Sequence, residues 1–181
     1  MKALETKFHE PGSDKPGVAL ADGSVISGYA SVFGVRDQGG DVVLPGAYAA
    51  SLKRLAASGG KVRMLWQHDQ TQPIGVWDEV VEDAHGLRVK GRLLTEVERG
   101  REAAALMAAG AVDGLSIGYR TIRAEKLPEG GRKLIELELW EVSLVTFPML
   151  PVARVAAKSQ DEGLLADFAR GIVAATAALR G

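Results

Sequence analysis

Cysteine is absent from the 181-residue chain, which excludes disulfide bonds, thiolate metal sites and a cysteine nucleophile. An excess of charge of either sign is absent as well, because 22 lysines and arginines face 23 aspartates and glutamates and leave a net charge of −1. A nearly neutral chain has no long-range field that would gather nucleic acid or an anionic membrane at its surface. We therefore expect no nucleic-acid partner.

Long apolar runs are also missing. The first residues, MKALETK, lack the apolar stretch of a signal peptide, and no segment reaches the roughly 18 uncharged apolar residues of a membrane span. Only three histidines occur, and the sequence contains no H-E-x-x-H motif. We expect a soluble, cytoplasmic protein without a membrane partner, a bound metal or another cofactor.

The residues that are present have the composition of a globular protein, with 46% apolar and 25% charged residues. The length provides one hydrophobic core but is short for two domains. Prolines and glycines interrupt residues 1–23, so we expect an irregular N-terminal segment there, with room for one short edge strand. Residues 24–158 form the expected domain. A polar linker and an amphipathic C-terminal helix follow in residues 159–181, where apolar residues recur at helical spacing.

Stretches of apolar and β-branched residues, several of them alternating, predict six strands. They cover residues 24–33, 61–68, 74–82, 87–94, 112–123 and 132–147. Two helices are expected within the domain: one begins at Pro45 and ends at Gly59 and Gly60, and the other spans residues 98–109 and ends at Gly110. This pattern predicts an α+β fold, mainly an antiparallel β-barrel that is closed or nearly closed.

One of the three histidines occupies a position suited to catalysis. His9 lies in the irregular N-terminal segment and His85 in a polar turn, so we expect both to face solvent. His68 ends the strand at 61–68, on the apolar face that it shares with Trp66, directly before a polar loop. An imidazole at the edge of a core can act as a general base, although the pattern alone favours a structural histidine.

Among the serines, Ser116 is distinguished by its neighbours in the run GLSIGY at 114–119. Glycines on both sides leave room for a substrate backbone to approach the hydroxyl. Their spacing matches the G-x-S-x-G nucleophile elbow, but that motif requires a strand, a turn and then a helix, whereas here the strand continues. The run by itself therefore indicates a candidate nucleophile and no particular enzyme class.

Glu141 is a carboxylate on an apolar face. It alternates with Leu137, Leu139 and Val145 along the last expected strand. An unpaired buried charge is costly, so Glu141 needs a partner. The partner is either a catalytic imidazole that the carboxylate orients or an arginine in a structural salt bridge.

Six short runs, taken in order, resemble the sequences of phage prohead proteases. They are GYASVF at 28–33, DVVLPGAY at 41–48, LWQHD at 65–69 with PIG at 73–75, GLRVKG at 86–91, GLSIGY at 114–119 and EVSLVT at 141–146. The resemblance extends over about residues 24–155.

The resemblance implies a serine endopeptidase whose fold is related to that of the herpesvirus capsid-maturation protease assemblin, a β-barrel surrounded by helices. It implies that Ser116 is the nucleophile and His68 its general base. Glu141 matches the third position of the catalytic triad, which is histidine in the herpesvirus relatives. The chemistry is consistent, because a serine hydroxyl needs a base to take its proton and a carboxylate fixes the imidazole tautomer.

Proteases of this family cut the scaffold segment of the major capsid protein inside the immature capsid, or prohead, and often cleave themselves. The same module occurs in gene transfer agents, which resemble tailed phages. The resemblance therefore implies the same partners and location for this chain, and the herpesvirus relatives suggest a homodimer by analogy. It gives no role to residues 159–181, which could be a docking element or a cleavable segment.

Two other functions compete with a protease. A catalytically silent barrel could bind coat or scaffold protein and merely retain an old site, but all three triad candidates are present. A metalloenzyme could use His68 and Asp69, although a single well-placed histidine makes a poor metal site. A probe for active-site serines would separate the protease from the silent barrel, and sensitivity to a chelator would reveal the metalloenzyme.

Overall fold

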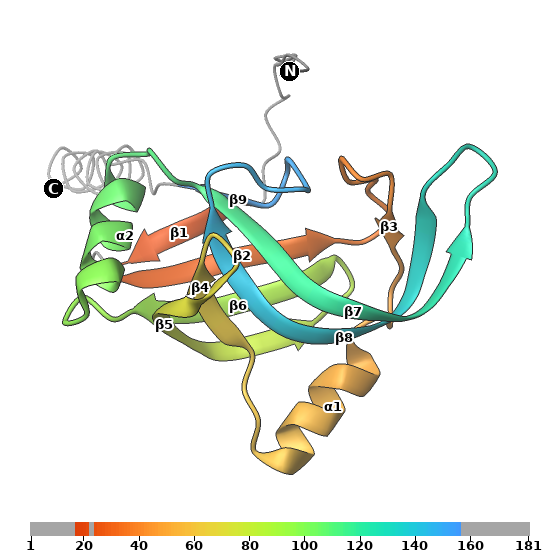
Figure 1. Cartoon of the computed structure of the whole chain (residues 1–181), viewed down its shortest axis with the longest axis horizontal. Coiled ribbons are helices and arrows are strands. Elements are labelled where there is room, and N and C mark those ends of the chain that lie inside the picture. The colour runs from red at the N-terminus through yellow and green to blue at the C-terminus, as the bar shows by residue number, and fades with distance from the viewer. Residues whose placement is uncertain (1–16, 22–23, 157–181) are drawn as a thin grey trace, which may run out of the picture.

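The computed structural model of the chain describes residues 17–21 and 24–156. In this part of the chain it contains nine strands and two helices (Figure 1). In chain order these are β1 (Gly17–Ala21), β2 (Val25–Val32), β3 (Val42–Val43), α1 (Ala49–Ser58), β4 (Arg63–Trp66), β5 (Asp69–Glu82), β6 (Gly86–Leu93), α2 (Glu98–Ala108), β7 (Gly114–Lys126), β8 (Arg132–Val145) and β9 (Arg154–Ala156).

The strands form one curved sheet in the order β3-β8-β4-β5-β6-β2-β1-β9-β7, and a long β7–β8 ladder leads from the last strand back to β8. The β1–β9, β3–β8 and β4–β8 ladders are parallel and the others are antiparallel. Strands β7 and β9 meet at a single residue pair, Gly114 and Arg154. The expected antiparallel barrel is therefore a mixed sheet, and its ring of strand pairings closes only through this single residue pair.

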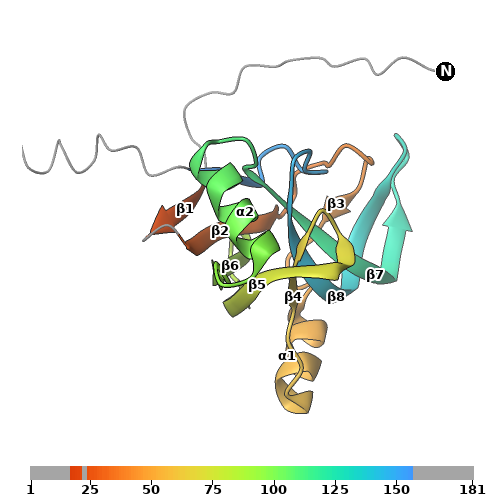
Figure 2. The same cartoon turned by 60° about the vertical axis from the view of Figure 1, so that its left-hand side comes forward.

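The two described helices lie at separate places instead of surrounding the sheet. Helix α2 packs against β5 and β6, and α1 packs mainly against β8 (Figure 2). Within the described residues, neither helix has the length and apolar character needed to cross a membrane. The C-terminal helix expected in residues 159–181, and all of the N-terminal segment before β1, lie outside the described residues.

Helix α1 begins at Ala49 and not at Pro45, where the sequence predicted its start. The intervening residues form a turn because Gly46 has a positive φ of 88°. The main-chain N–H groups of Gly46 and Tyr48 both donate to the carboxylate of Glu82, at the end of β5. The helix ends as predicted, with Gly59 in the left-handed conformation.

Strand β8 determines where the candidate residues lie, because two different strands flank its C-terminal half. Residues 141–144 pair with β4 on one side and with β7 on the other. Both faces are covered here, since residues 141–145 are all buried. A polar side chain in this segment must therefore find its hydrogen-bond partners within the protein.

A β-bulge at Trp140 reverses which side chains of β8 face the core. On β7 the consecutive residues Gly118 and Tyr119 pair with Glu141 and Leu139, so Trp140 is an extra residue on β8. Before the bulge, the odd-numbered residues Leu137 and Leu139 face the core. After it, the even-numbered residues Val142 and Leu144 face the core. The sequence placed Glu141 on the face of Leu137 and Leu139, which is wrong, because the bulge turns its side chain to the other face.

Close backbone packing between β2 and β6 generates a test of the fold. A Cβ atom added to Gly86 would lie 2.0 Å from the carbonyl oxygen of Ser31. We expect Gly86→Ala to lower the free energy of unfolding by about 1–3 kcal/mol, the usual cost of overpacking. The control is Gly60→Ala, whose added methyl meets first a flexible side-chain carbon of Leu55. Urea unfolding measures both, and equal stability of the two variants would contradict the packing described.

Candidate active site

His68 lies in a tight turn and not at the end of a strand. Strand β4 ends at Trp66, which pairs with Asp69 at the start of β5, so Gln67 and His68 form a two-residue hairpin turn. The predicted polar loop at 69–72 is instead part of β5. Both turn residues have positive φ values, 52° and 63°, as in a type I′ turn. Glycine and asparagine are usual there, and other side chains cost on the order of 1–3 kcal/mol each.

Hydrogen bonds to the end of β8 hold this strained turn in place. The main-chain N–H of Gln67 donates to the carbonyl of Leu144, at 2.9 Å. The side-chain amide of Gln67 binds Thr146 twice: its Nε2 donates to Oγ1 at 2.8 Å, and its Oε1 accepts from the main-chain N–H at 3.3 Å. The tip of the β4–β5 hairpin is therefore fixed to a strand about 80 residues away in the sequence.

The imidazole of His68 meets the carboxylate of Glu141 on the face of the sheet opposite the core. Nδ1 of His68 lies 2.5 Å from Oε1 of Glu141. The other carboxylate oxygen, Oε2, accepts a hydrogen bond of 2.5 Å from the hydroxyl of Ser143, and the same hydroxyl accepts one of 3.3 Å from the main-chain N–H of His68. The carboxylate side chain is 11% exposed and the imidazole 41% exposed.

This contact determines the chemistry that the imidazole can perform. When Nδ1 carries the ring proton and donates it to Glu141, Nε2 is left with a free lone pair. A neutral imidazole held in this tautomer can accept a proton from a neighbouring group. The sequence expected His68 on the same face as Trp66; the turn places the ring on the opposite face, where Glu141 and Ser143 lie.

Ser116 lies beside this cluster on the neighbouring strand. It pairs with Ser143 in the β7–β8 ladder, and directly paired residues of two strands have their side chains on the same face. Its side chain is largely buried, with the residue 6% exposed. Among the described residues the structure records no hydrogen bond between the Ser116 hydroxyl and His68. Ser116, His68 and Glu141 thus come from three adjacent strands or their turns and gather on one face.

Gly118 makes room for the carboxylate. It pairs with Glu141, and a Cβ atom added to it would lie 2.0 Å from Oε1 of Glu141. The space beside Gly114 is likewise occupied, by Val145 and Pro148. The two glycines that flank Ser116 therefore accommodate the protein's own groups, and not an approaching substrate backbone as the sequence suggested.

Asp69 and His85 have other partners. The Asp69 carboxylate accepts hydrogen bonds from Thr71 and Gln72, and the bonds from Thr71 lower the pKa of Asp69 below its ordinary value. The ring of His85 packs edge-on against Tyr29, with centroids 4.6 Å apart. No group of three histidine, aspartate or glutamate side chains that could hold a metal ion occurs in the described part of the chain. His9 lies outside it.

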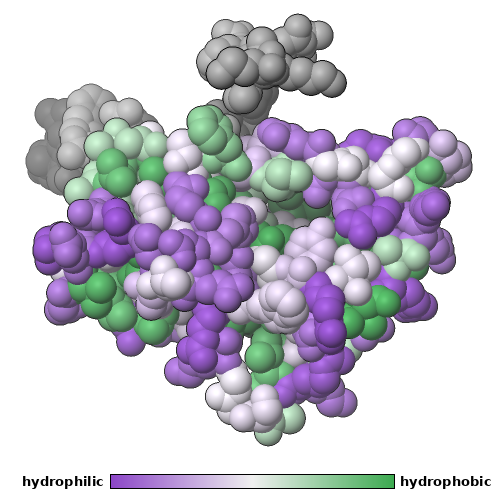
Figure 3. All heavy atoms as spheres, in the orientation of Figure 1, coloured by the Kyte–Doolittle hydropathy of each residue, from purple (hydrophilic) through white to green (hydrophobic). Residues whose placement is uncertain are grey.

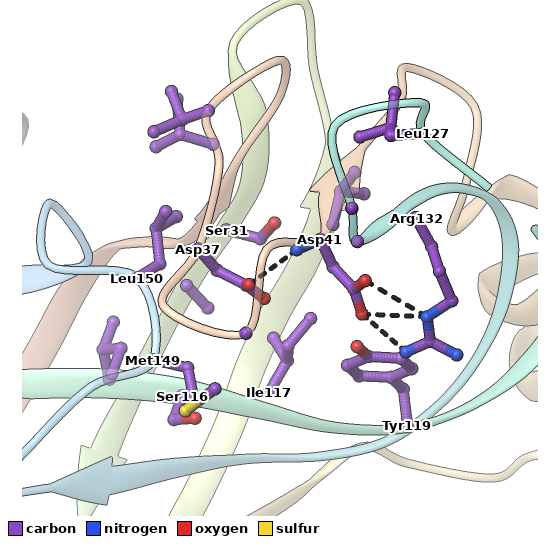
Figure 4. A pocket seen from close by; sticks show the side chains of 18 of the residues that line it. Ser31, Asp37, Asp41, Ser116, Ile117, Tyr119, Leu127, Arg132, Met149 and Leu150 are labelled. Carbon is purple, nitrogen blue, oxygen red and sulfur yellow. Dashed lines mark hydrogen bonds and ion pairs between the residues drawn. The ribbon is translucent and has the colours of Figure 1, made fainter. Parts of the chain in front are cut away.

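A cavity of about 630 Å³ adjoins Ser116 (Figure 4). Ile117 points into it from β7, and Met149 and Leu150 line it from the segment that follows β8. On its far side Arg132 forms a bidentate ion pair with Asp41, in which Nε donates to Oδ1 and Nη2 to Oδ2, and this pair raises the pKa of the guanidinium. The wall near Ser116 is mainly apolar, since Ile117, Met149 and Leu150 line it.

On the face shown in Figure 3, polar and apolar side chains are interspersed, and the surface is hollowed near its centre.

Three residues at the site were not singled out from the sequence. Ser143 could have been found, because it follows Glu141 by two positions in a predicted strand and must share its face. Gln67 and Thr146 gave no signal, since their contact depends on the way β4 and β8 come together.

Comparisons with known proteins show what this chain is similar to. The family described as caudovirus prohead serine protease matches residues 14–165. The prohead protease of Enterobacteria phage HK97 is 33% identical over 163 residues, which cover 88% of this chain and 68% of the phage protein. The capsid polyprotein of Pseudomonas phage PAJU2 is 33% identical over 94 residues, 48% of this chain but 14% of the polyprotein.

A solved structure is similar in fold. The bacteriophage T4 capsid assembly protease superposes with a TM-score of 0.56 at 18% sequence identity, covering 78% of this chain and 94% of that protein. At this identity the similarity concerns the fold alone. The family match, in contrast, spans most of the sequence, and one relative is 33% identical over two thirds of its length. The chain therefore belongs to the caudovirus prohead serine protease family, and it is a peptidase of that family.

Proposed function

We propose that this chain is a serine endopeptidase that matures a capsid, with Ser116 as nucleophile, His68 as general base and Glu141 as the group that orients His68. The observation that carries the proposal is the contact between Nδ1 of His68 and the Glu141 carboxylate, on the strand next to Ser116. It leaves Nε2 free on the face where Ser116 lies, which is the arrangement that a serine nucleophile requires.

The reaction would proceed in two halves. In the first, Nε2 of His68 takes the proton of the Ser116 hydroxyl while Oγ attacks the carbonyl carbon of the scissile peptide bond. The imidazolium, stabilised by Glu141, then gives this proton to the leaving amine, and an acyl-enzyme remains. In the second half, His68 takes a proton from water as the water oxygen attacks the acyl carbon, and it then gives this proton to Oγ of Ser116 as the bond to the acyl group breaks and the carboxylic acid product leaves. The cavity beside Ser116 offers room for a substrate side chain.

The substrate that we propose is the scaffold segment of a major capsid protein, cut inside the prohead, with self-cleavage as a second reaction. The names of the relatives support a capsid partner: a prohead protease, a capsid polyprotein and a capsid assembly protease. In the capsid polyprotein, a segment similar to this chain is part of a longer chain that is named for the capsid, which also supports a capsid substrate.

The turn at His68 favours an active enzyme over a silent binding barrel. A protein that only bound coat protein would gain stability from asparagine and glycine at the two turn positions, since these residues adopt positive φ without strain. The chain instead has Gln67 and His68 there, and it buries Glu141 next to the ring. Strain of this kind persists where function requires it.

Replacing the nucleophile tests the mechanism directly. We expect Ser116→Ala to abolish cleavage of the co-expressed coat protein, because loss of the nucleophile in a comparable protease costs about 10⁶ in kcat. The control is Ser58→Ala, which removes an exposed hydroxyl at the end of α1. Mass spectrometry of the coat protein after co-expression reports the products. Normal processing by a folded Ser116→Ala protein would disprove the serine mechanism.

Glu141→Gln tests the orienting role. Both carboxylate oxygens of Glu141 accept hydrogen bonds, whereas a glutamine amide replaces one of these acceptors with an NH2 donor, so that His68 and Ser143 can no longer each donate to an oxygen of their own. We expect kcat to fall by about 10⁴, as in the corresponding replacement in a Ser-His-Asp protease. The measurement is single-turnover cleavage of a coat-derived peptide. Unchanged kcat would leave Glu141 as a structural partner only.

Gly118→Ala tests the same contact from the opposite strand. Its methyl group would occupy the position of Oε1 of Glu141 and displace the carboxylate. Because a misplacement of about 1 Å can cost 10²-fold, we expect a loss of that size in kcat. Circular dichroism and a thermal melt check that the sheet is retained. A fully active Gly118→Ala protein would show that the carboxylate does not need its observed position.

A further inference from the structure

A second serine of the cluster, Ser143, is completely buried. The residue is 0% exposed and lies in the half of β8 that is flanked by β4 and β7. It pairs with Ser116 on one side and with Leu65 on the other. Its hydroxyl is therefore on the same face as the candidate nucleophile, but no substrate can reach it.

The Ser143 hydroxyl joins two of the groups proposed to act in catalysis. It donates its proton to Oε2 of Glu141 at 2.5 Å and accepts the main-chain N–H of His68 at 3.3 Å. A serine hydroxyl has a single proton, and this proton is directed at the carboxylate. Because the residue is also fully buried, Ser143 is not itself available as a nucleophile.

These contacts constrain the carboxylate in a specific way. Without Ser143, the Glu141 carboxylate could rotate about its terminal torsion, which has a broad and shallow energy profile. With Oε2 bound to Ser143, Oε1 is directed at Nδ1 of His68. The second contact holds the backbone of His68, whose positive φ is unfavourable on its own. One hydroxyl thus fixes both the carboxylate and the base that it orients.

We propose that Ser143 is a positioning residue for the reaction: it sets the orientation of Glu141 and the backbone of His68, so that Nε2 faces the Ser116 hydroxyl. This proposal depends on the function proposed above. It assigns to the serine of the EVSLVT run a part in catalysis that is exerted through His68 and Glu141, without contact with the substrate.

The chain offers a matched control for the loss of a buried hydroxyl. Ser51 of α1 is 2% exposed, and its hydroxyl accepts a 3.0 Å hydrogen bond from the main-chain N–H of Leu139, also on β8. Ser51→Ala therefore removes a buried serine that braces the same strand but lies outside the cluster. A purely structural role for Ser143 predicts the same consequences for both alanine variants.

The test uses the full chain and a fluorophosphonate probe, which reacts without a known peptide substrate. In this reaction Oγ of Ser116 forms a bond to phosphorus, fluoride leaves, and the serine proton passes to His68. We expect Ser143→Ala to slow labelling of Ser116 by about tenfold to a hundredfold, the effect of losing a hydrogen bond to a charged group. Ser51→Ala should label at the rate of the unaltered chain. Ser143→Thr, which retains the hydroxyl, should recover most of the rate.

Two further readouts separate positioning from stability. With a cleaved coat-derived peptide, Ser143→Ala should lower kcat and leave KM nearly unchanged, because the substrate does not contact Ser143. In proton NMR spectra, the downfield resonance expected for the proton between His68 and Glu141 should shift or disappear in Ser143→Ala and remain in Ser51→Ala. If Ser143→Ala does not fold, Ser143→Cys keeps a side chain of the same shape, slightly larger, and substitutes a weak donor.

The outcomes distinguish this proposal from the one on which it depends. If Ser116→Ala abolishes labelling while Ser143→Ala and Ser143→Cys label at the unaltered rate, the positioning role is overturned and the serine mechanism stands. If Ser143→Thr is as slow as Ser143→Ala, the hydroxyl is not the relevant group and the proposal also fails. If the unaltered chain is not labelled at Ser116, the proposed function itself is overturned.

Discussion

A buried carboxylate on an interior strand is the constraint around which the candidate site is built. Glu141 lies where β8 has a neighbour on each side, so water cannot supply its hydrogen bonds. Both neighbouring strands accommodate the Glu141 carboxylate. The β4–β5 hairpin brings the imidazole of His68 to one oxygen, and β7 has a glycine where any side chain would collide with the carboxylate. The arrangement of the three strands thus provides the hydrogen-bond partner and the space that the Glu141 carboxylate requires.

The bulge at Trp140 explains how an acidic residue can occupy such a strand. Without the extra residue, Glu141 would follow Leu137 and Leu139 into the apolar core, where it would have no polar partner. With it, Val142 and Leu144 fill the core, and Glu141 and Ser143 face the hairpin. Bulges commonly re-aim side chains next to functional sites. Here one extra residue in β8 keeps Glu141 and Ser143 out of the apolar core and places them together in a polar cluster.

The sequence singled out three candidate residues that lie together in the structure, but it described their surroundings less well. Alternating apolar residues predicted most strands, and the cost of a buried charge correctly indicated that Glu141 needs a partner. Local patterns could not decide between an imidazole and an arginine, because the answer depends on the parallel pairing of β4 with β8, about 80 residues apart. They also missed the turn at Gln67 and His68, where neither residue is one that usually adopts positive φ. The bulge could not be predicted from local patterns either, because the register of a strand is fixed by the strands that pair with it.

The hairpin at Gln67 and His68 has a consequence for the evolution and engineering of this protein. Stability alone would favour asparagine and glycine at these two positions, since that pair relieves the backbone strain of the turn. Under the proposed mechanism the same exchange removes the base. Selection for higher stability and selection for proteolytic activity therefore favour different residues at these two positions. A screen that rewarded only thermal resistance would tend to yield well-folded proteins that have lost the ability to cut.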